Sequence, residues 1–239
     1  MALTPYYDDG NGIQIFLGDC RLILPHLEPV DLVLTDPPYE SEAHTLQRRV
    51  KREGGVMEVE PLAFPPMDAA TREFVGAQVG RLAKRWALTF CQVEAAPIWR
   101  SSYEQGGLFY KRTCIWVKPD GMPQYSGDRP GMGYETFVAM HAEGRSVWNG
   151  GGRHGVFVVN KNDNGGRPNE HPTTKPLQLI KDLVWLFSEE GDTVLDPFMG
   201  SGTTLRAAKD LGRKCIGIEI EEKYCEIAAK RLAQEVLNL

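Results

Sequence analysis

Short apolar runs recur along the chain, and between them apolar residues return about every three or four positions. A near-continuous apolar run is typical of a strand that is buried on both faces of a sheet, whereas the longer spacing is typical of a helix. The runs predict strands at Ile13–Leu17, Leu32–Thr35, Trp86–Cys91, Thr113–Val117, Thr136–His141, Thr193–Asp196 and Cys215–Glu219. The helical spacing predicts helices over about 71–85, 94–104, 177–189, 203–211 and 221–236.

Strands that alternate with helices are typical of a doubly wound α/β domain, in which helices cover both faces of a mostly parallel sheet. A chain of 239 residues is long enough for one large domain of this kind. We therefore expect residues 1–239 to form a single domain.

Two stretches do not fit this pattern. Residues 40–70 are polar and charged and then rich in proline, which predicts a mobile loop. Residues 119–170 are rich in glycine and place Trp148, Asn149 and His154 among arginines. Because aromatic and hydrogen-bonding side chains beside cations suit contacts to bases and phosphates, the second stretch is predicted to be a small recognition insert.

The formal net charge of −5 counts mildly against a nucleic-acid partner, although net charge says little about one groove. Two groups of side chains are candidates for phosphate contacts, with a solvated surface as the alternative for each. The first is a compact run, Arg48, Arg49, Lys51 and Arg52. The second is spread through the glycine-rich stretch and consists of Arg145, Arg153, Lys161 and Arg167, with His154 beside them.

The five cysteines have no metal-ligand spacing, so no metal site is predicted. Their odd number and their positions in predicted strands indicate reduced, mostly buried thiols of a cytoplasmic protein. No apolar run is long enough to cross a bilayer, and the amino terminus has no signal-peptide pattern. We therefore expect no membrane association.

The tetrapeptide Asp36-Pro37-Pro38-Tyr39 closes the second apolar run and suits the handling of an exocyclic amino group on a nucleobase. Such a nitrogen is a poor nucleophile until hydrogen-bond acceptors favour its pyramidal form, and Asp36 and the rigid Pro37 carbonyl provide two acceptors. Tyr39 provides a flat surface on which an extruded base would stack. The alternative is a proline-rich turn in which the tyrosine fills an edge of the core.

The segment Asp196-Pro-Phe-Met-Gly-Ser-Gly-Thr-Thr204 closes another apolar run. Gly200 and Gly202 permit a tight turn into a helix, and Glu219 ends the next strand, where an acidic side chain suits ribose hydroxyls. A dinucleotide site requires a small residue where this chain has Leu205, and no Gly-Lys-Ser/Thr follows, so a phosphate-binding P-loop is absent. The pattern favours an adenosine with an amino-acid tail, with an ordinary strand–turn–helix as the alternative.

These two motifs resemble those of the amino-group DNA methyltransferases, which use S-adenosylmethionine. The acceptor motif comes first here, as in the circularly permuted β class of that family. The segments Leu17–Cys20 and His171–Pro176 also resemble family motifs. The resemblance covers residues 13–39 and about 110–235, and none is found in residues 40–75.

The resemblance implies a circularly permuted, Rossmann-like methyltransferase fold with a mostly parallel seven-stranded sheet and one antiparallel strand. It also implies the role of each matching residue. The target base would be held by Asp36, Pro37, Pro38 and Tyr39. The cofactor S-adenosylmethionine would be held by Asp19, Cys20, Thr173, Lys175, Asp196, Pro197, Phe198, Gly200, Ser201, Gly202, Thr203 and Glu219.

Further expectations follow from the same resemblance. The partner would be double-stranded DNA, contacted by the loop 40–70 and the insert 119–170, and the chain would be a bacterial or phage-encoded modification enzyme that forms a homodimer. Relatives with Asp in the first acceptor position mostly methylate adenine N6, so Asp36 favours adenine. Methylation of cytosine C5 is disfavoured because no cysteine follows a proline. The remaining alternatives are cytosine N4, a planar nitrogen in RNA or protein, and a DNA-binding module without catalysis.

Overall fold

The computed structural model describes residues 3–38, 67–121, 123–125, 127–161 and 174–234. Most of the predicted loop 40–70 therefore lies outside the described residues. In the described part, the strands form one sheet with the order β1-β2-β9-β8-β3-β4-β6-β5-β7. Their bounds are β1 (Tyr7–Asp8), β2 (Ile13–Leu17), β3 (Val30–Thr35), β4 (Ala83–Cys91), β5 (Phe109–Val117), β6 (Tyr134–His141), β7 (Val156–Val158), β8 (Thr193–Asp196) and β9 (Lys214–Glu219).

All seven predicted strands are present, but the described sheet has nine strands, so the predicted number is corrected. The two additional strands, β1 and β7, are edge strands of two and three residues, too short to produce a periodic pattern. Strands β2, β9, β8, β3 and β4 are parallel to one another. Strand β6 is antiparallel to both of its neighbours, and β1 is antiparallel to β2.

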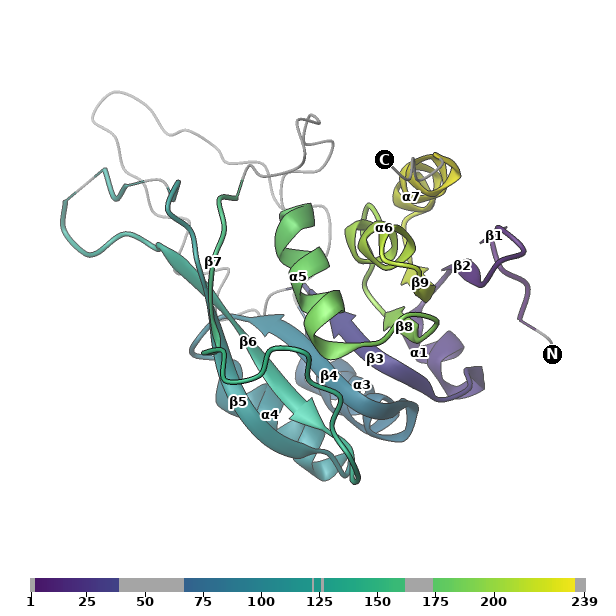
Figure 1. The fold of residues 1–239 in the computed structure, drawn as a ribbon, viewed down its shortest axis with the longest axis horizontal. Helices are drawn as coiled ribbons and strands as arrows, with labels where there is room; N and C mark the ends of the chain where they lie inside the picture. The colour runs from purple at the N-terminus through teal and green to yellow at the C-terminus, as the bar shows by residue number, and fades with distance from the viewer. Residues whose placement is uncertain (1–2, 39–66, 122, 126, 162–173, 235–239) are drawn as a thin grey trace.

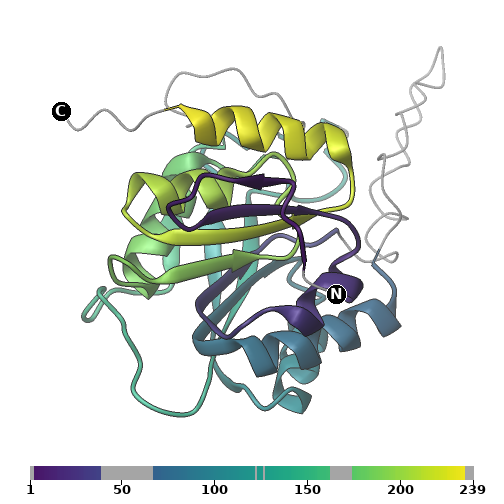
Figure 2. The same cartoon turned by 90° about the vertical axis from the view of Figure 1, so that its right-hand side faces the viewer.

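Helices cover both faces of the sheet, which confirms the doubly wound arrangement (Figures 1 and 2). One face is covered by α5 (Leu177–Phe187), α6 (Thr203–Asp210) and α7 (Glu222–Ala233). The other is covered by α1 (Cys20–Ile23), η1 (Leu24–His26), α3 (Ala69–Leu82) and α4 (Ala96–Gln105). The predicted helix 71–85 ends early, because Ala83 already pairs with Val30 as the first residue of β4.

Each face of the sheet has its own apolar core. On one face, Leu183 and Val184 of α5 share a core with residues of β2, β3 and β4. On the other face, Val79 of α3 and Trp99 of α4 belong to the second core. The five cysteines are all free and buried, as expected from the sequence. No helix in the described ranges is long and apolar enough to cross a membrane.

Helices α3 and α4 approach each other through glycines. A Cβ atom on Gly80 would lie 1.9 Å from the carbonyl oxygen of Gly106, and one on Gly76 would lie 2.7 Å from that of Ser102. Both distances are far below van der Waals contact, so only glycine permits this backbone approach.

The Gly80→Ala substitution is expected to lower the free energy of unfolding by about 2 kcal/mol, because α3 and α4 must move apart to admit the methyl group. Urea denaturation measures this change. Gly152→Ala is the matched control, since its Cβ would meet nothing within 4 Å, and it should change stability by less than about 0.5 kcal/mol. Equal effects of the two substitutions would contradict the close approach.

Candidate active site

The chemical groups gather at one edge of the sheet because parallel strands end on the same side. Asp36 follows β3, Asp196 ends β8 and Glu219 ends β9. They line a cleft of about 800 Å³. The predicted site residues that line it are Asp19, Cys20, Asp36, Pro37, Pro38, Lys175, Asp196, Pro197, Phe198, Gly200, Ser201, Thr203 and Glu219.

The two sequence motifs touch each other directly. Strands β3 and β8 are neighbours, with Leu32 opposite Val194, and the Thr35 hydroxyl donates a hydrogen bond of 2.7 Å to Asp196 Oδ1. The Phe198 amide donates to the same oxygen at 3.1 Å. The acceptor motif and the glycine turn therefore share one cleft, as the sequence predicts.

Asp196 is a buried carboxyl whose pKa lies above its ordinary value. Burial raises its pKa to about 6, although hydrogen bonds from Thr204, Thr35 and the Phe198 amide favour the charged form. Ionisation of Asp196 therefore destabilises the folded chain above about pH 6, and this penalty is relieved as the pH falls from about 6 toward the ordinary pKa.

An Asp196→Asn variant should be more stable than the wild type at about pH 8, where the wild-type carboxylate is charged, and this advantage should shrink toward about pH 5. Urea denaturation of both proteins across this range tests the sign. Asp182→Asn, at a side chain of α5 that hydrogen-bonds to Gln178, is the control and should show no such trend. A stability difference that is independent of pH would contradict the assignment.

The glycine turn is shaped by Glu219. Gly200 and Gly202 have φ angles of +49° and +79°, which favour glycine. The Gly200 amide donates to Glu219 Oε2 at 3.1 Å, and the Glu221 amide donates to Oε1 at 2.9 Å. Burial raises the pKa of Glu219, while the amide hydrogen bonds favour its charged form. The carboxylate thus fixes the turn and lines the cleft at the same time.

The back of the turn is held by helix α7. Gly202 packs on this helix instead of lining the cleft, because its Cβ would lie 2.7 Å from Ala228 Cβ. Arg231 Nη1 donates to the Ser201 carbonyl at 2.9 Å and lies 3.2 Å from the Ser201 hydroxyl. Arg231 was not predicted as a site residue.

Within the described residues, one carboxylate oxygen of Asp36 is paired and the other is not. One oxygen, Oδ2, lies 2.5 Å from Lys175 Nζ. The other, Oδ1, is buried and has no hydrogen-bond partner among the described residues. Burial raises the pKa of Asp36, and the Lys175 ammonium opposes this shift. A buried carboxylate oxygen without a donor is suited to accept a hydrogen bond from a ligand.

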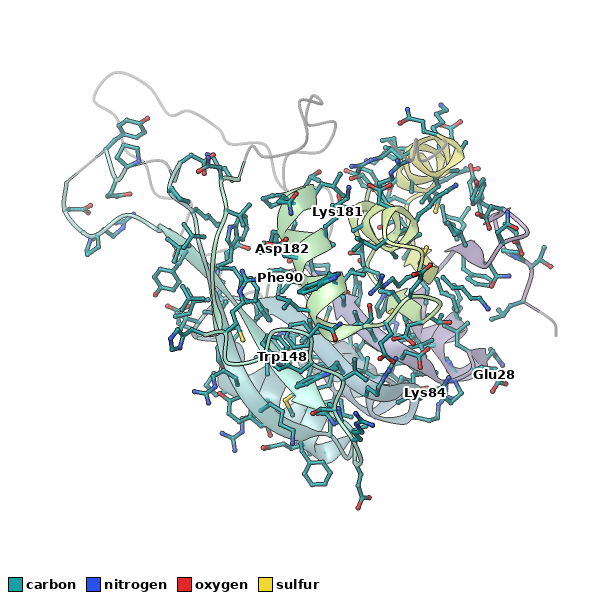
Figure 3. All side chains as sticks on the ribbon, in the orientation of Figure 1. Glu28, Lys84, Phe90, Trp148, Lys181 and Asp182 are labelled. Carbon is teal, nitrogen blue, oxygen red and sulfur yellow. The ribbon has the colours of Figure 1, made fainter. Side chains whose placement is uncertain are left out.

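Lys175 is held by a network that spans several elements. Its Nζ lies 3.2 Å from Glu135 Oε2, and Glu135 also pairs with Lys118. Phe90, labelled in Figure 3, lies beneath the ammonium, with 5.1 Å between Nζ and the ring centre. In the structure Lys175 therefore contacts the acceptor carboxylate, whereas the sequence placed it beside the cofactor.

The remaining wall is formed by the start of α1. Asp19 caps this helix by accepting from the Arg21 amide at 2.8 Å, and the Arg21 guanidinium pairs with the same carboxylate. Burial raises the pKa of the neighbouring Cys20 thiol to about 12. Cys20 is therefore a neutral wall residue and not a nucleophile.

The other predicted contacts either lie outside the described residues or belong to a connection that does not line the cleft. Tyr39, Thr173, Arg48, Arg49, Lys51, Arg52 and Arg167 lie outside the described residues. Arg145, Arg153 and His154 lie between β6 and β7, and this connection begins at the far end of β6, where His141 pairs with Trp86 near the start of β4. Trp148 of the same connection packs on Phe187 at the end of α5 (Figure 3).

A different part of the glycine-rich stretch borders the cleft. The connection from β5 to β6 begins at Lys118 and ends at Met132 and Tyr134, which all line the cleft. It extends beyond the end of the sheet in Figure 1, and the side chain of Tyr125 is 80% exposed. Among the described residues of the stretch 119–170, the cleft is therefore lined by residues of this connection and by Lys161, which follows β7.

Comparison with known proteins agrees with this geometry. A family model described as DNA methylase matches residues 143–230. Type II methyltransferase M.HinfI of Haemophilus influenzae is 29% identical over 254 residues, which cover 92% of this chain and 68% of that protein. The structure of the M1.HpyAVI–SAM complex has a TM-score of 0.73 and 27% identity, over 93% of this chain and 100% of that one.

These similarities support an N6/N4 DNA methyltransferase. Type II methyltransferase M.XycI of Xanthomonas campestris pv. cyanopsidis is 34% identical over 155 residues, or 59% of this chain. This chain thus spans about half (51%) of the length of M.XycI. The PvuII cytosine-N4-specific DNA methyltransferase, at 18% identity and a TM-score of 0.72, shares the fold.

Sequence patterns missed one part of this candidate site. Glu135 is the second residue of β6, and because β6 is antiparallel, its first residues lie at the edge where the parallel strands end. A search restricted to the carboxyl ends of strands overlooks such a residue. Recognising the direction of this strand from the sequence would have placed Glu135 beside Asp36.

Proposed function

We propose that this chain transfers a methyl group from S-adenosylmethionine to N6 of an adenine that is extruded from duplex DNA. The observation that carries the proposal is the pairing, in one cleft, of the partner-free Asp36 Oδ1 with the glycine turn that Glu219 shapes. The relative M1.HpyAVI, whose solved structure is a complex with SAM, supports this choice of cofactor.

The residues at the donor end fit this cofactor. The cleft of about 800 Å³ is of the size that encloses a ligand of this class. Glu219 offers a buried carboxylate to ribose hydroxyls, Asp19 lies on the wall for an adenine amino group, and the turn at Gly200 permits close approach of the methionine part. When bound, S-adenosylmethionine supplies an electrophilic methyl group on a positively charged sulfur.

The residues at the acceptor end prepare the amino nitrogen. Asp36 Oδ1 accepts a hydrogen bond from one N–H of the base, and the rigid Pro37 carbonyl accepts the other. As the nitrogen–carbon bond forms and the carbon–sulfur bond breaks, positive charge develops on the nitrogen, and Asp36 stabilises it. One proton then leaves the methylated nitrogen, which restores a neutral amine.

The choice of adenine is supported by the acceptor residue and not by the fold. The PvuII enzyme, which is cytosine-N4-specific, has a similar fold, so the architecture is compatible with either base. Asp36 at the first acceptor position resembles relatives that mostly methylate adenine. Cytosine N4 is accordingly the second candidate.

The experiment is transfer of an isotope-labelled methyl group to duplex DNA, followed by digestion to nucleosides and chromatography. Label in N6-methyl-2′-deoxyadenosine is the expected result. Label in N4-methylcytosine would overturn the base and preserve the class. Label in structured RNA but not in DNA would overturn the substrate, and tight donor binding without turnover would favour a binding module. Duplex DNA is the proposed partner, and a homodimer and a cytoplasmic location remain predictions.

A further inference from the structure

Four charged side chains alternate in sign along the acceptor end of the cleft. Lys118 follows β5, Glu135 lies at the start of β6 after Tyr134, Lys175 precedes α5 and Asp36 follows β3. Lys118 pairs with Glu135, Lys175 Nζ lies 3.2 Å from Glu135 Oε2, and the same Nζ lies 2.5 Å from Asp36 Oδ2. Lys175 is only 8% exposed, so solvent screens the arrangement weakly.

Lys175 alone would balance the charge of Asp36, so charge balance at Asp36 does not explain the presence of Glu135 and Lys118. An unshared Lys175 would place its whole charge on the acceptor carboxylate and weaken it as an acceptor. Glu135 shares that charge. Burial opposes ionisation of Glu135, but Lys175 and Lys118 together outweigh it and hold the pKa of Glu135 below its usual range, so Glu135 is an anion.

The charges around Asp36 act in opposite directions. Burial raises the pKa of Asp36, Lys175 lowers it, Glu135 raises it and Lys118 lowers it. Asp196, across the Thr35 hydroxyl, is also an acidic neighbour of Asp36. Glu135 and Lys118 therefore act on Asp36 with opposite signs, although they contact each other and hold the same strands together.

We propose that Glu135 is a positioning residue for methyl transfer, which shares Lys175 with Asp36 and so keeps the acceptor carboxylate basic. The inference rests on the proposed function. In that reaction the methylated nitrogen must lose one proton after the carbon–sulfur bond has broken. Asp36 Oδ1 takes this proton and releases it to water, and a more basic carboxylate does so more readily.

A purely structural role predicts different results. If the network only joined β5, β6 and the start of α5, loss of Glu135 or of Lys118 would disturb Asp36 in the same direction or not at all. A role through charge predicts shifts of opposite sign. The sign of the shift in the Asp36 titration in the two variants therefore distinguishes a structural role from a role through charge, without any measurement of stability.

The experiment compares Glu135→Gln and Lys118→Gln, each in the full chain and without donor. Carbon-13 NMR of side-chain carboxyls follows the titration of Asp36, which is assigned by its loss in Asp36→Ala. In Glu135→Gln the Asp36 titration should move to lower pH, and in Lys118→Gln it should move to higher pH. Glu104→Gln, which removes an exposed partner of Arg100 on α4, is the matched control and should leave it unchanged.

Kinetics provide the second measurement. Glu135→Gln should lower kcat about tenfold and move the acidic limb of the kcat profile to lower pH, while KM for the donor changes less than about twofold. Glu135→Asp, which restores the charge, should recover most of kcat. Shifts of Asp36 in the same direction in both variants, or in neither, would overturn the proposal.

This design distinguishes failure of the proposal for Glu135 from failure of the proposed function. If Glu135→Gln does not fold, as judged by circular dichroism, Lys118→Gln decides alone, since its Asp36 titration must rise. If the wild type transfers no methyl group to any nucleic acid, the proposed function fails, whereas the NMR comparison still shows whether Glu135 controls the charge on Asp36.

Discussion

Asp36→Ala is expected to slow methyl transfer by about 10³-fold while donor affinity stays within about threefold of the wild type. The reason is that Asp36 follows the strand end at the acceptor side of the cleft, and its Oδ1 is buried and has no hydrogen-bond donor among the described residues. Its loss removes both the hydrogen bond that pyramidalises the amino group and the acceptor for the departing proton. Single-turnover transfer of labelled methyl groups measures the rate, and calorimetry measures donor affinity.

Folding of this variant is checked separately. Lys175 retains Glu135 as a partner after the substitution, so the variant should show a wild-type circular dichroism spectrum. Asp182→Ala, at a side chain of α5 that contacts Gln178, is the control and should transfer at the wild-type rate. Full-rate transfer by Asp36→Ala would exclude the proposed role of the acceptor motif.

Glu219→Ala is expected to weaken donor binding by about 100-fold. The substitution leaves the Gly200 and Glu221 amides without their acceptor, which loosens the glycine turn, and it removes the carboxylate that faces the cleft. Glu219→Gln preserves the size and one acceptor oxygen, so it should weaken binding less, by about tenfold. Calorimetric titration with S-adenosylmethionine measures both values.

The control for this series is Glu226→Ala, since Glu226 is a 61% exposed side chain on the neighbouring helix α7. It should bind the donor as the wild type does. Unchanged donor affinity in Glu219→Ala would show that the donor binds elsewhere, and the site at the end of β9 would have to be abandoned.

The sequence predicted the part of the site that is built from strand ends. Buried strands produce apolar runs, and each of the runs ending at Asp36, Asp196 and Glu219 places its acidic residue at the same edge. The pattern of apolar residues along the chain does not show which distant segments pair with each other. The hydrogen bond between Thr35 and Asp196 joins residues 161 positions apart, and only the family resemblance indicated that they meet.

Other parts could not be predicted for identifiable reasons. The strand β7 has three residues and is held by its pairing with Ile115–Val117, so its sequence shows no alternation of useful length. The cations Arg145 and Arg153 suggested a DNA surface by composition alone. Their placement depends on the direction of β6, which carries the chain away from the cleft before these residues are reached.

The adjacency of β3 and β8 in the sheet places the candidate reacting groups at the ends of two neighbouring strands. Because these two strands lie side by side, the reacting centre is preserved whatever peptide links β3 to β4 or β5 to β6. Under the proposed function, a change in one of those connections would alter which DNA sequence is modified and leave the catalytic groups in place.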